Sequence, residues 1–252
     1  MSKDITSILD GWDFEPGKIS VRKIIGHDKR VKIQLRLDLG LLQMEMTGRP
    51  DGQRPHGCES LLHYYRRRLE AQHEVAAKDF AFELSPRDCE ALRAEAMMYY
   101  HRYLSEFALE EYDAVVRDTE RNLDVLELCH RHARTDTDRM AMEQYRPYIL
   151  MMHTRAKAMA AMGKDDFASA RHAVQEGLSR MRAFGEELEQ LEAVENSPEM
   201  AVLRSLLEEI EQREPMDPIR AIEASLAQAL ADERYEDAAR IRDRLRLLKG
   251  GQ

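Results

Sequence analysis

The densest cluster of potential metal ligands in this chain is a cysteine with two histidines. Cys129, His130 and His132 lie within four residues of one another. On a helix, residues one and two positions apart point to different faces, so these side chains do not converge on one ion. The other cysteines, Cys58 and Cys89, form no Cys-x-x-Cys pair. We therefore interpret the cluster as an exposed helix end, and we expect neither a metal nor a cofactor.

The sequence contains no recognisable catalytic arrangement of side chains. No serine lies in a Gly-x-Ser-x-Gly turn, and neither of the glycine-rich phosphate-binding motifs occurs. Acidic pairs such as Asp165-Asp166 and Glu208-Glu209 are interpreted as helix-end or surface residues. The residue types therefore favour a protein that is not an enzyme.

Basic residues gather around a segment, 47–57, that is rich in glycine and proline. It precedes a predicted helix, whose N-terminal N–H groups and dipole favour an anion. The candidate anion-binding residues are Arg49, Arg54, His56, Arg66, Arg67 and Arg68. An anion site here would bind nucleic-acid phosphate, a nucleotide or an acidic protein face. The alternative, which we favour, is that the arginines form structural ion pairs with an acidic helical body, as isolated basic clusters commonly do.

Composition and charge describe a charge-rich chain with an uneven distribution of charge. The 252 residues are 34% charged and 43% hydrophobic, with a net charge of −9. Residues 19–70 hold eleven Lys/Arg against six Asp/Glu, whereas residues 71–216 hold 18 against 30. No apolar run approaches the length of a membrane span, and the N-terminus lacks the layout of a secretory signal. We expect a cytoplasmic protein with no membrane partner.

The hydrophobic pattern predicts an α+β fold that is predominantly α. Alternation around Val21, from Val31 to Leu39 and from Leu42 to Met46 predicts a small antiparallel meander of three strands. A long helix is expected from about Ser60, and from Ser85 onward the pattern is helical throughout. We divide the chain into a sheet with flanking helices (1–84), a helical body (85–213) and a C-terminal helical hairpin (217–252).

The helical body contains a weak internal repeat with an offset of 55 residues. Tyr112, Val115, Thr119 and Leu123 match Phe167, Ala170, Val174 and Leu178. Each unit is interpreted as a helix, a short polar turn and a helix that begins near an aromatic residue. The stretch from Met162 to Ala170 resembles the turn of a tetratricopeptide repeat, although the period differs from that of the family. An ordinary helical bundle is the alternative.

The C-terminal residues predict two helices, Ile219–Leu230 and Tyr235–Leu248, with Asp217 as N-cap and Gly250-Gly251 after the end. The second helix carries two neighbouring stripes, which together form the candidate partner-binding surface. These residues are Tyr235, Ala238, Ala239 and Arg242, and Ile241, Leu245 and Leu248. A hairpin of this size buries little of its own surface, so the second stripe is a spare apolar face. The alternative is that this face packs on preceding helices.

The string from Tyr235 to Leu245 resembles the UVR motif, the helical hairpin shared by the B and C subunits of bacterial excinuclease. The resemblance implies a docking device that pairs with a second copy, or with a partner's copy, as a four-helix bundle. It covers the hairpin alone, since the helicase motifs of the B subunit are missing.

The sequence therefore predicts a non-enzymatic adaptor or scaffold that binds a protein partner, or a second copy, through the hairpin. One alternative is a DNA repair-associated nucleic-acid-binding accessory factor that uses the basic N-terminal residues. Another is an enzyme that acts on a small anionic substrate at the 47–57 loop.

Overall fold

The structure, a computed structural model, describes residues 4–74, 82–214 and 218–249. The chain divides into two compact units, residues 1–208 and 209–252, and each is described by itself. The expected division into three parts, 1–84, 85–213 and 217–252, remains a prediction.

The first unit begins with a three-stranded antiparallel sheet in the order β1-β2-β3. Its strands are β1 (Val21–Ile25), β2 (Val31–Arg36) and β3 (Leu41–Glu45). The predicted meander is confirmed. The second strand is shorter than its alternation suggested, because Leu37 donates its N–H to the Gly40 carbonyl at 2.9 Å and so begins the turn to β3. Leu39, at the tip of that turn, is consequently 90% exposed.

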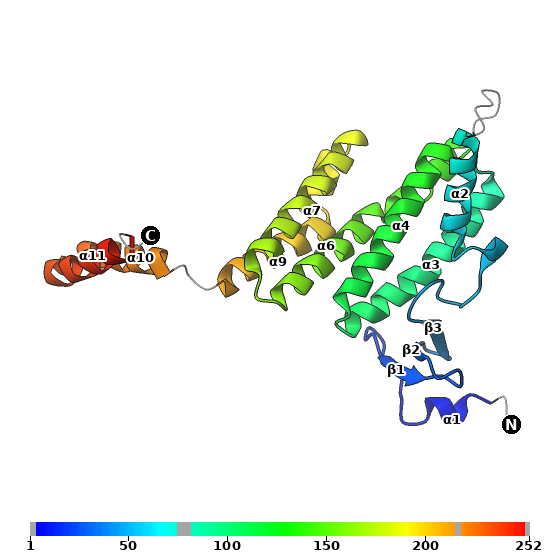
Figure 1. Cartoon of the computed structure of the whole chain (residues 1–252), viewed down its shortest axis with the longest axis horizontal. Coiled ribbons are helices and arrows are strands. Elements are labelled where there is room, and N and C mark those ends of the chain that lie inside the picture. The colour runs from blue at the N-terminus through cyan, green and yellow to red at the C-terminus, as the bar shows by residue number, and fades with distance from the viewer. Residues whose placement is uncertain (1–3, 75–81, 215–217, 250–252) are drawn as a thin grey trace. The chain divides into compact units, whose positions relative to one another are not determined.

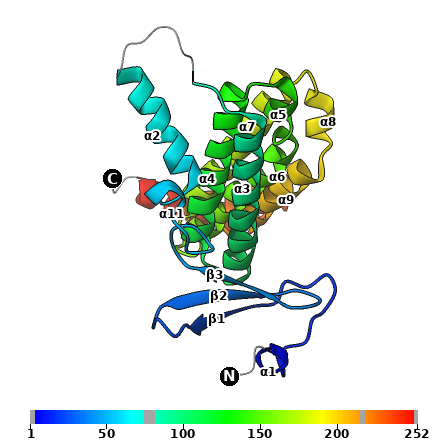
Figure 2. The ribbon, with the colours of Figure 1, turned by 90° about the vertical axis from the view of Figure 1, so that its right-hand side faces the viewer.

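One face of the sheet packs toward the helices of the first unit. Ile33, Leu35 and Met44 form its buried core, and Leu109, just after the end of α3 (Pro86–Ala108), packs against them. Figure 2 shows the strands as one layer beside the lower end of the long helices. On the opposite face, the Arg22 guanidinium lies 3.9 Å from the centre of the Trp12 ring. The sheet is thus covered on both sides at its middle.

The rest of the first unit is helical (Figure 1). Its helices are α1 (Thr6–Leu9), η1 (Pro55–Gly57), α2 (Leu61–Glu74), α3 (Pro86–Ala108), α4 (Tyr112–His132), α5 (Asp136–Met140), η2 (Glu143–Tyr145), α6 (Arg146–Met162), α7 (Phe167–Glu187), α8 (Leu191–Glu195) and α9 (Pro198–Arg213), the last of which runs into the second unit. Ser85 caps α3 in a capping box with Asp88, as its position before Pro86 predicts. An α+β fold that is predominantly α is confirmed.

Two helical hairpins of the body repeat with the offset of 55 residues. The second helix of each hairpin begins at Tyr112 in α4 and at Phe167 in α7. Each is preceded by a turn residue with a left-handed backbone, at φ 59° for Glu110 and 57° for Asp165. In both turns, the residue that follows donates its N–H to the carbonyl five residues earlier. These hydrogen bonds join Glu111 to Glu106 at 2.9 Å and Asp166 to Ala161 at 3.0 Å. This arrangement satisfies carbonyls that the helix end leaves free.

The residues that follow these turns lie in the core. Val115 and Ala170, three positions after the aromatic residue in each hairpin, are both 0% exposed. Helices α6 and α7 approach closely at Gly177, where a Cβ would lie 2.2 Å from Thr154 Oγ1. A relationship to tetratricopeptide repeats remains a prediction.

The second unit contains α10 (Pro218–Ala231) and α11 (Tyr235–Lys249), which pack against each other. Its turn repeats those of the body. Glu233 has φ 57°, and Arg234 donates its N–H to the Ala229 carbonyl at 2.8 Å. The proposed N-cap Asp217 and the terminal Gly250-Gly251 lie outside the described residues. The predicted helical pair is therefore present, with the same turn as the helical body.

Candidate functional site

The contact between the two helices of the C-terminal hairpin is made by small residues. Ala229 in α10 is 1% exposed and Ala238 in α11 is 4% exposed. Small side chains allow two helix axes to approach, and a close approach leaves little room for larger apolar groups between them. Among the described side chains of the hairpin, these two alanines are the buried ones.

Larger apolar side chains of the hairpin stay wholly or partly accessible to solvent. Leu230 is 51% exposed and Tyr235 is 66% exposed. Ile241 and Leu245 are half-buried. Of the other candidate partner-binding residues, Ala239 is half-buried and Arg242 is exposed, and the Leu248 side chain lies outside the described residues. The hairpin therefore offers apolar surface at its turn and along α11.

The α3–α4 hairpin of the helical body has the same turn as the C-terminal hairpin, so its residues can be compared with Leu230 and Tyr235. Tyr112 and Phe107 stand in the same places as Tyr235 and Leu230, on either side of the turn. Their rings pack edge to face with centroids 5.5 Å apart, and the Arg155 guanidinium from α6 lies 4.6 Å from the Phe107 ring centre. Both rings are half-buried. In α3–α4 these positions are thus half-buried, with Arg155 of α6 over Phe107, whereas in α10–α11 they are exposed.

The candidate anion-binding residues lie at the other end of the chain and make several contacts within the first unit. Arg49 Nε is 3.6 Å from Glu95 Oε1, and Arg66 forms a 2.9 Å ion pair with Asp124. Both carboxylates belong to the helical body. These two arginines therefore hold the loop and α2 against α3 and α4.

The other four candidate anion-binding residues make separate contacts. His56 stacks on Tyr64 with ring centres 4.1 Å apart. Arg67 donates to Cys58 Sγ at 3.8 Å, and the Arg68 guanidinium lies 5.8 Å from the Tyr64 ring centre. Arg54 is exposed. Of the six residues, Arg66 and Arg67 line one polar cavity, and the other four are not among its lining residues.

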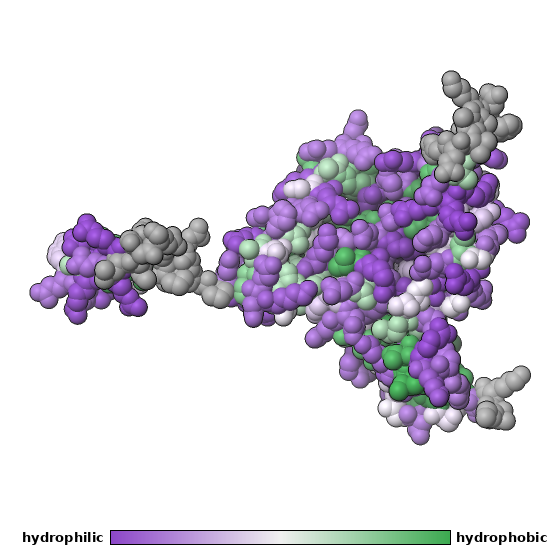
Figure 3. All heavy atoms as spheres, in the orientation of Figure 1, coloured by the Kyte–Doolittle hydropathy of each residue, from purple (hydrophilic) through white to green (hydrophobic). Residues whose placement is uncertain are grey.

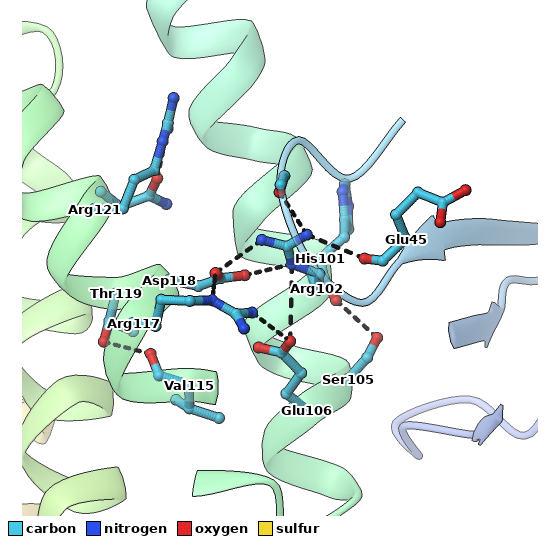
Figure 4. Close-up of polar contacts among 12 residues, drawn as sticks. Glu45, His101, Arg102, Ser105, Glu106, Val115, Arg117, Asp118, Thr119 and Arg121 are labelled. Atoms are coloured by element: carbon cyan, nitrogen blue, oxygen red, sulfur yellow. Dashed lines mark hydrogen bonds and ion pairs between the residues drawn. The ribbon is translucent and has the colours of Figure 1, made fainter. Parts of the chain in front are cut away.

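A buried ion network was missed by the sequence analysis (Figure 4). The Arg102 side chain is 1% exposed and forms a bidentate pair with Asp118, at 2.6 and 2.9 Å. Its remaining terminal nitrogen donates to the carbonyls of Glu45 and Gly48, at 3.0 and 2.8 Å. Arg102 therefore joins α3 to α4 and to the segment that follows β3. No sequence signal pairs these residues, since each lies on its helix among other charges.

Glu106 is the group in this network whose ionisation is most perturbed. Burial, followed by the nearby Asp118 carboxylate, raises the pKa of Glu106 to about 8. Arg117 donates to Glu106 Oε1 at 2.9 Å, whereas the buried Oε2 has no hydrogen-bond partner among the described residues. A protonated carboxyl at neutral pH is the expected consequence, because the neutral form is cheaper to bury.

Two open cavities flank this region of the first unit. A polar cavity of about 510 Å³ is lined by both basic and acidic side chains, including Arg66, Arg117, Arg121 and Asp124. A largely apolar one of about 420 Å³ lies between α3 and α6 and is lined by four tyrosines with Met97, Met142 and Arg93. Figure 3 shows a further group of apolar atoms over the part that carries the sheet.

Metal-ligating side chains do not cluster in the part of the chain that the structure describes. No group of three His, Cys, Asp or Glu residues with suitable geometry occurs there. Cys129 is buried as a free thiol, and His130 Nδ1 lies 3.6 Å from Glu143 Oε1. Among the described helices, none is both long and apolar enough to span a bilayer.

Comparison with known proteins assigns the C-terminal hairpin. Residues 217–250 match the family model of the UvrB/uvrC motif. The resemblance predicted from the string Tyr235–Leu245 is thereby confirmed. No curated protein and no solved structure matches the chain. The hairpin is a UVR motif, and the match concerns this segment alone.

Proposed function

We propose that this protein is a non-enzymatic adaptor or scaffold that docks a protein partner through its C-terminal UVR hairpin. The observation that carries the proposal is the exposure of Leu230 and Tyr235, at 51% and 66%. The equivalent residues in the α3–α4 hairpin, Phe107 and Tyr112, are half-buried, and Arg155 of α6 lies over the Phe107 ring. A partner helix placed in the same way would remove this apolar surface from water, which is the main favourable term in association.

The motif supports a setting in which UVR hairpins act, namely protein interaction or nucleic-acid binding connected with DNA repair. A nucleic-acid-binding role through the N-terminal arginines has less support, because Arg49 and Arg66 are engaged by carboxylates of the body. An enzyme at the 47–57 loop also has less support. Neither Arg49 nor His56 is among the side chains that line the polar cavity. A cytoplasmic location belongs to the proposal.

The proposal is tested by partner capture with four matched chains. The full-length chain is compared with one that lacks residues 217–252 and with the double variant Leu230→Gln and Tyr235→Ser. Both substituted side chains are exposed, so the hairpin is expected to keep its helices. The control is Val202→Gln, another exposed apolar residue, 37% accessible, in α9.

We expect the deletion and the double variant to lose the partners that the full-length chain and the Val202→Gln control retain. Circular dichroism of each variant checks that its helices are intact. Equal capture by all four chains would show that the hairpin is not the docking element.

A further inference from the structure

The charges of the C-terminal hairpin are separated along its length. Around the turn, residues 232–237 contain four acidic residues and one arginine. In α11 beyond the turn, residues 238–249 contain five basic residues and one acidic residue. The hairpin is neutral as a whole, yet the length of α11 that follows the turn is a strongly basic surface.

The arginines of α11 differ in whether the hairpin itself supplies a counter-charge. Arg240 forms a 2.7 Å ion pair with Asp237, and Arg242 forms a 3.0 Å pair with Asp243. Both pairs are exposed, and exposed pairs contribute little. Arg244 and Arg246 are also exposed, and neither forms an ion pair with any of the described residues. These two guanidinium groups are available to a partner.

The basic residues border an apolar stripe on both sides. At about 100° per residue in an α-helix, Ile241 and Leu245 fall on one face of α11. Arg244 then lies to one side of that face, and Arg242 and Arg246 lie to the other. In Figure 3, the described atoms of the hairpin that face the viewer are mostly hydrophilic. A half-buried apolar stripe between two cationic edges is the pattern that a partner must complement.

From this charge pattern we infer that the hairpin docks an acidic amphipathic helix, in which an apolar stripe is flanked by carboxylates. The inference rests on the proposed docking function and adds the chemistry of the partner. Carboxylates of such a helix meet Arg244 and Arg246, while its apolar residues cover the exposed parts of Ile241 and Leu245. Electrostatic complementarity of this kind steers encounter and selects partners.

A nucleic-acid backbone satisfies only half of this pattern. It supplies phosphates for the arginines but has no apolar stripe to cover Leu230, Tyr235 and Ile241. The rest of the chain also opposes a polyanion, since the net charge is −9 and residues 71–216 hold 30 acidic against 18 basic residues. The acidic helix is therefore the occupant that fits both the charge and the apolar surface.

The test uses the full-length chain and four labelled probes in fluorescence anisotropy titrations. The first probe is a synthetic helix of about 20 residues, long enough to be helical, with a leucine stripe flanked by glutamates. The second has the same composition in scrambled order. The third replaces each glutamate by lysine, and the fourth is a DNA duplex of similar length. We expect the striped acidic helix to bind at least roughly tenfold more tightly than the other three.

Two charge-reversal variants locate the binding surface. Arg244→Glu with Arg246→Glu is expected to weaken binding of the striped acidic helix by roughly tenfold or more, because like charges then face each other. The matched control, Arg87→Glu with Lys164→Glu, makes the same change of charge at two exposed positions outside the hairpin and is expected to leave the affinity unchanged. Binding should also weaken as salt is raised.

Other outcomes overturn the inference. Equal binding of the striped and scrambled peptides would mean plain attraction to negative charge, and tighter binding of DNA would mean that the surface is a nucleic-acid site. If no probe binds, the partner is not an acidic helix. The docking proposal is judged separately. If deletion of 217–252 abolishes partner capture while the striped peptide fails to bind, the adaptor function stands and only the acidic partner is rejected.

Discussion

Arg102 connects parts of the first unit that are distant in the sequence. It is paired with Asp118 in α4 and donates to the carbonyls of Glu45 and Gly48. A buried carboxylate that loses a buried cation is costly, and Asp118 would keep only its 2.8 Å pair with Arg117, whose side chain is 43% exposed. The residue-scale predictions therefore concern this network.

Replacing Arg102 by Leu is expected to lower the free energy of unfolding by about 3–5 kcal/mol, the cost of breaking one side of a buried pair. Chemical denaturation of both proteins measures the loss. The control is the double variant Arg102→Leu with Asp118→Leu, which removes both charges and should recover part of the stability. A single variant as stable as the unaltered protein would contradict the structural role.

Glu106 predicts a pH dependence of stability with a definite sign. Its pKa is raised from 4.5 to about 8 in the folded protein. Between these values the folded state binds more protons than the unfolded state, so its stabilising contribution falls as pH rises through the window from 4.5 to 8. The contribution is complete below 4.5 and lost above about 8.

The variant Glu106→Gln replaces the titratable carboxyl by an amide that does not titrate. Thermal melts at several pH values should show the unaltered protein losing stability relative to Glu106→Gln as pH rises across that window. Parallel curves for the two proteins would mean that Glu106 ionises normally.

Helical hairpins with one type of turn recur through the chain. Glu110, Asp165 and Glu233 each adopt the left-handed backbone two residues before an aromatic helix start. The element-scale predictions follow from this turn and from the packing behind it.

Substituting Glu110 by Gly is expected to stabilise the protein by roughly 1 kcal/mol, because glycine adopts a positive φ without the steric cost that a Cβ brings. Thermal denaturation gives the change in stability. The neighbouring Glu111 has φ −85°, so Glu111→Gly offers no such relief and serves as the control. A larger gain for Glu111→Gly would contradict the assigned turn.

Ala170 tests the packing of the second hairpin. It is 0% exposed, whereas the adjacent Ser169 is exposed. Ala170→Leu should destabilise the fold by about 1–3 kcal/mol through overpacking, and Ser169→Leu should have a smaller effect. Denaturation curves compare the two, and equal effects would mean that the helix presents a different face to the core.

At the scale of the whole molecule, charge is segregated. Residues 19–70 are basic and residues 71–216 are acidic, and some of the opposite charges meet within the first unit. Among these ion pairs between the basic segment and the helical body, Arg49 has the most buried partner, since the Glu95 side chain is 0% exposed. Whether the basic segment also binds an anion stays a prediction.

Replacing Arg49 and Arg54 by Gln separates the two roles. If the arginines are structural, stability falls by about 1 kcal/mol, mostly from Arg49, whose guanidinium lies 3.6 Å from the buried Glu95 carboxylate without a hydrogen bond. Nucleic-acid binding in gel-shift titrations at two salt concentrations then stays the same for both proteins. Tight, salt-sensitive binding that the Gln variant loses would instead identify an anion site.

The sequence by itself determined the parts of this protein that depend on local order. Alternation predicted the meander, Ser85 before Pro86 predicted the start of α3, and the string from Tyr235 to Leu245 identified the UVR motif. Each of these signals lies within one segment, where side-chain period and backbone preference act over a few residues.

Only the tertiary structure decided which distant residues meet. Arg102 and Asp118 are common charged residues in helices, and nothing in their local sequence shows that they are buried together with the Glu45 carbonyl. Likewise, Tyr112 and Tyr235 follow the same turn, yet Tyr112 is half-buried within its unit whereas Tyr235 is 66% exposed. Burial is a property of the surrounding fold, so a single segment cannot encode it.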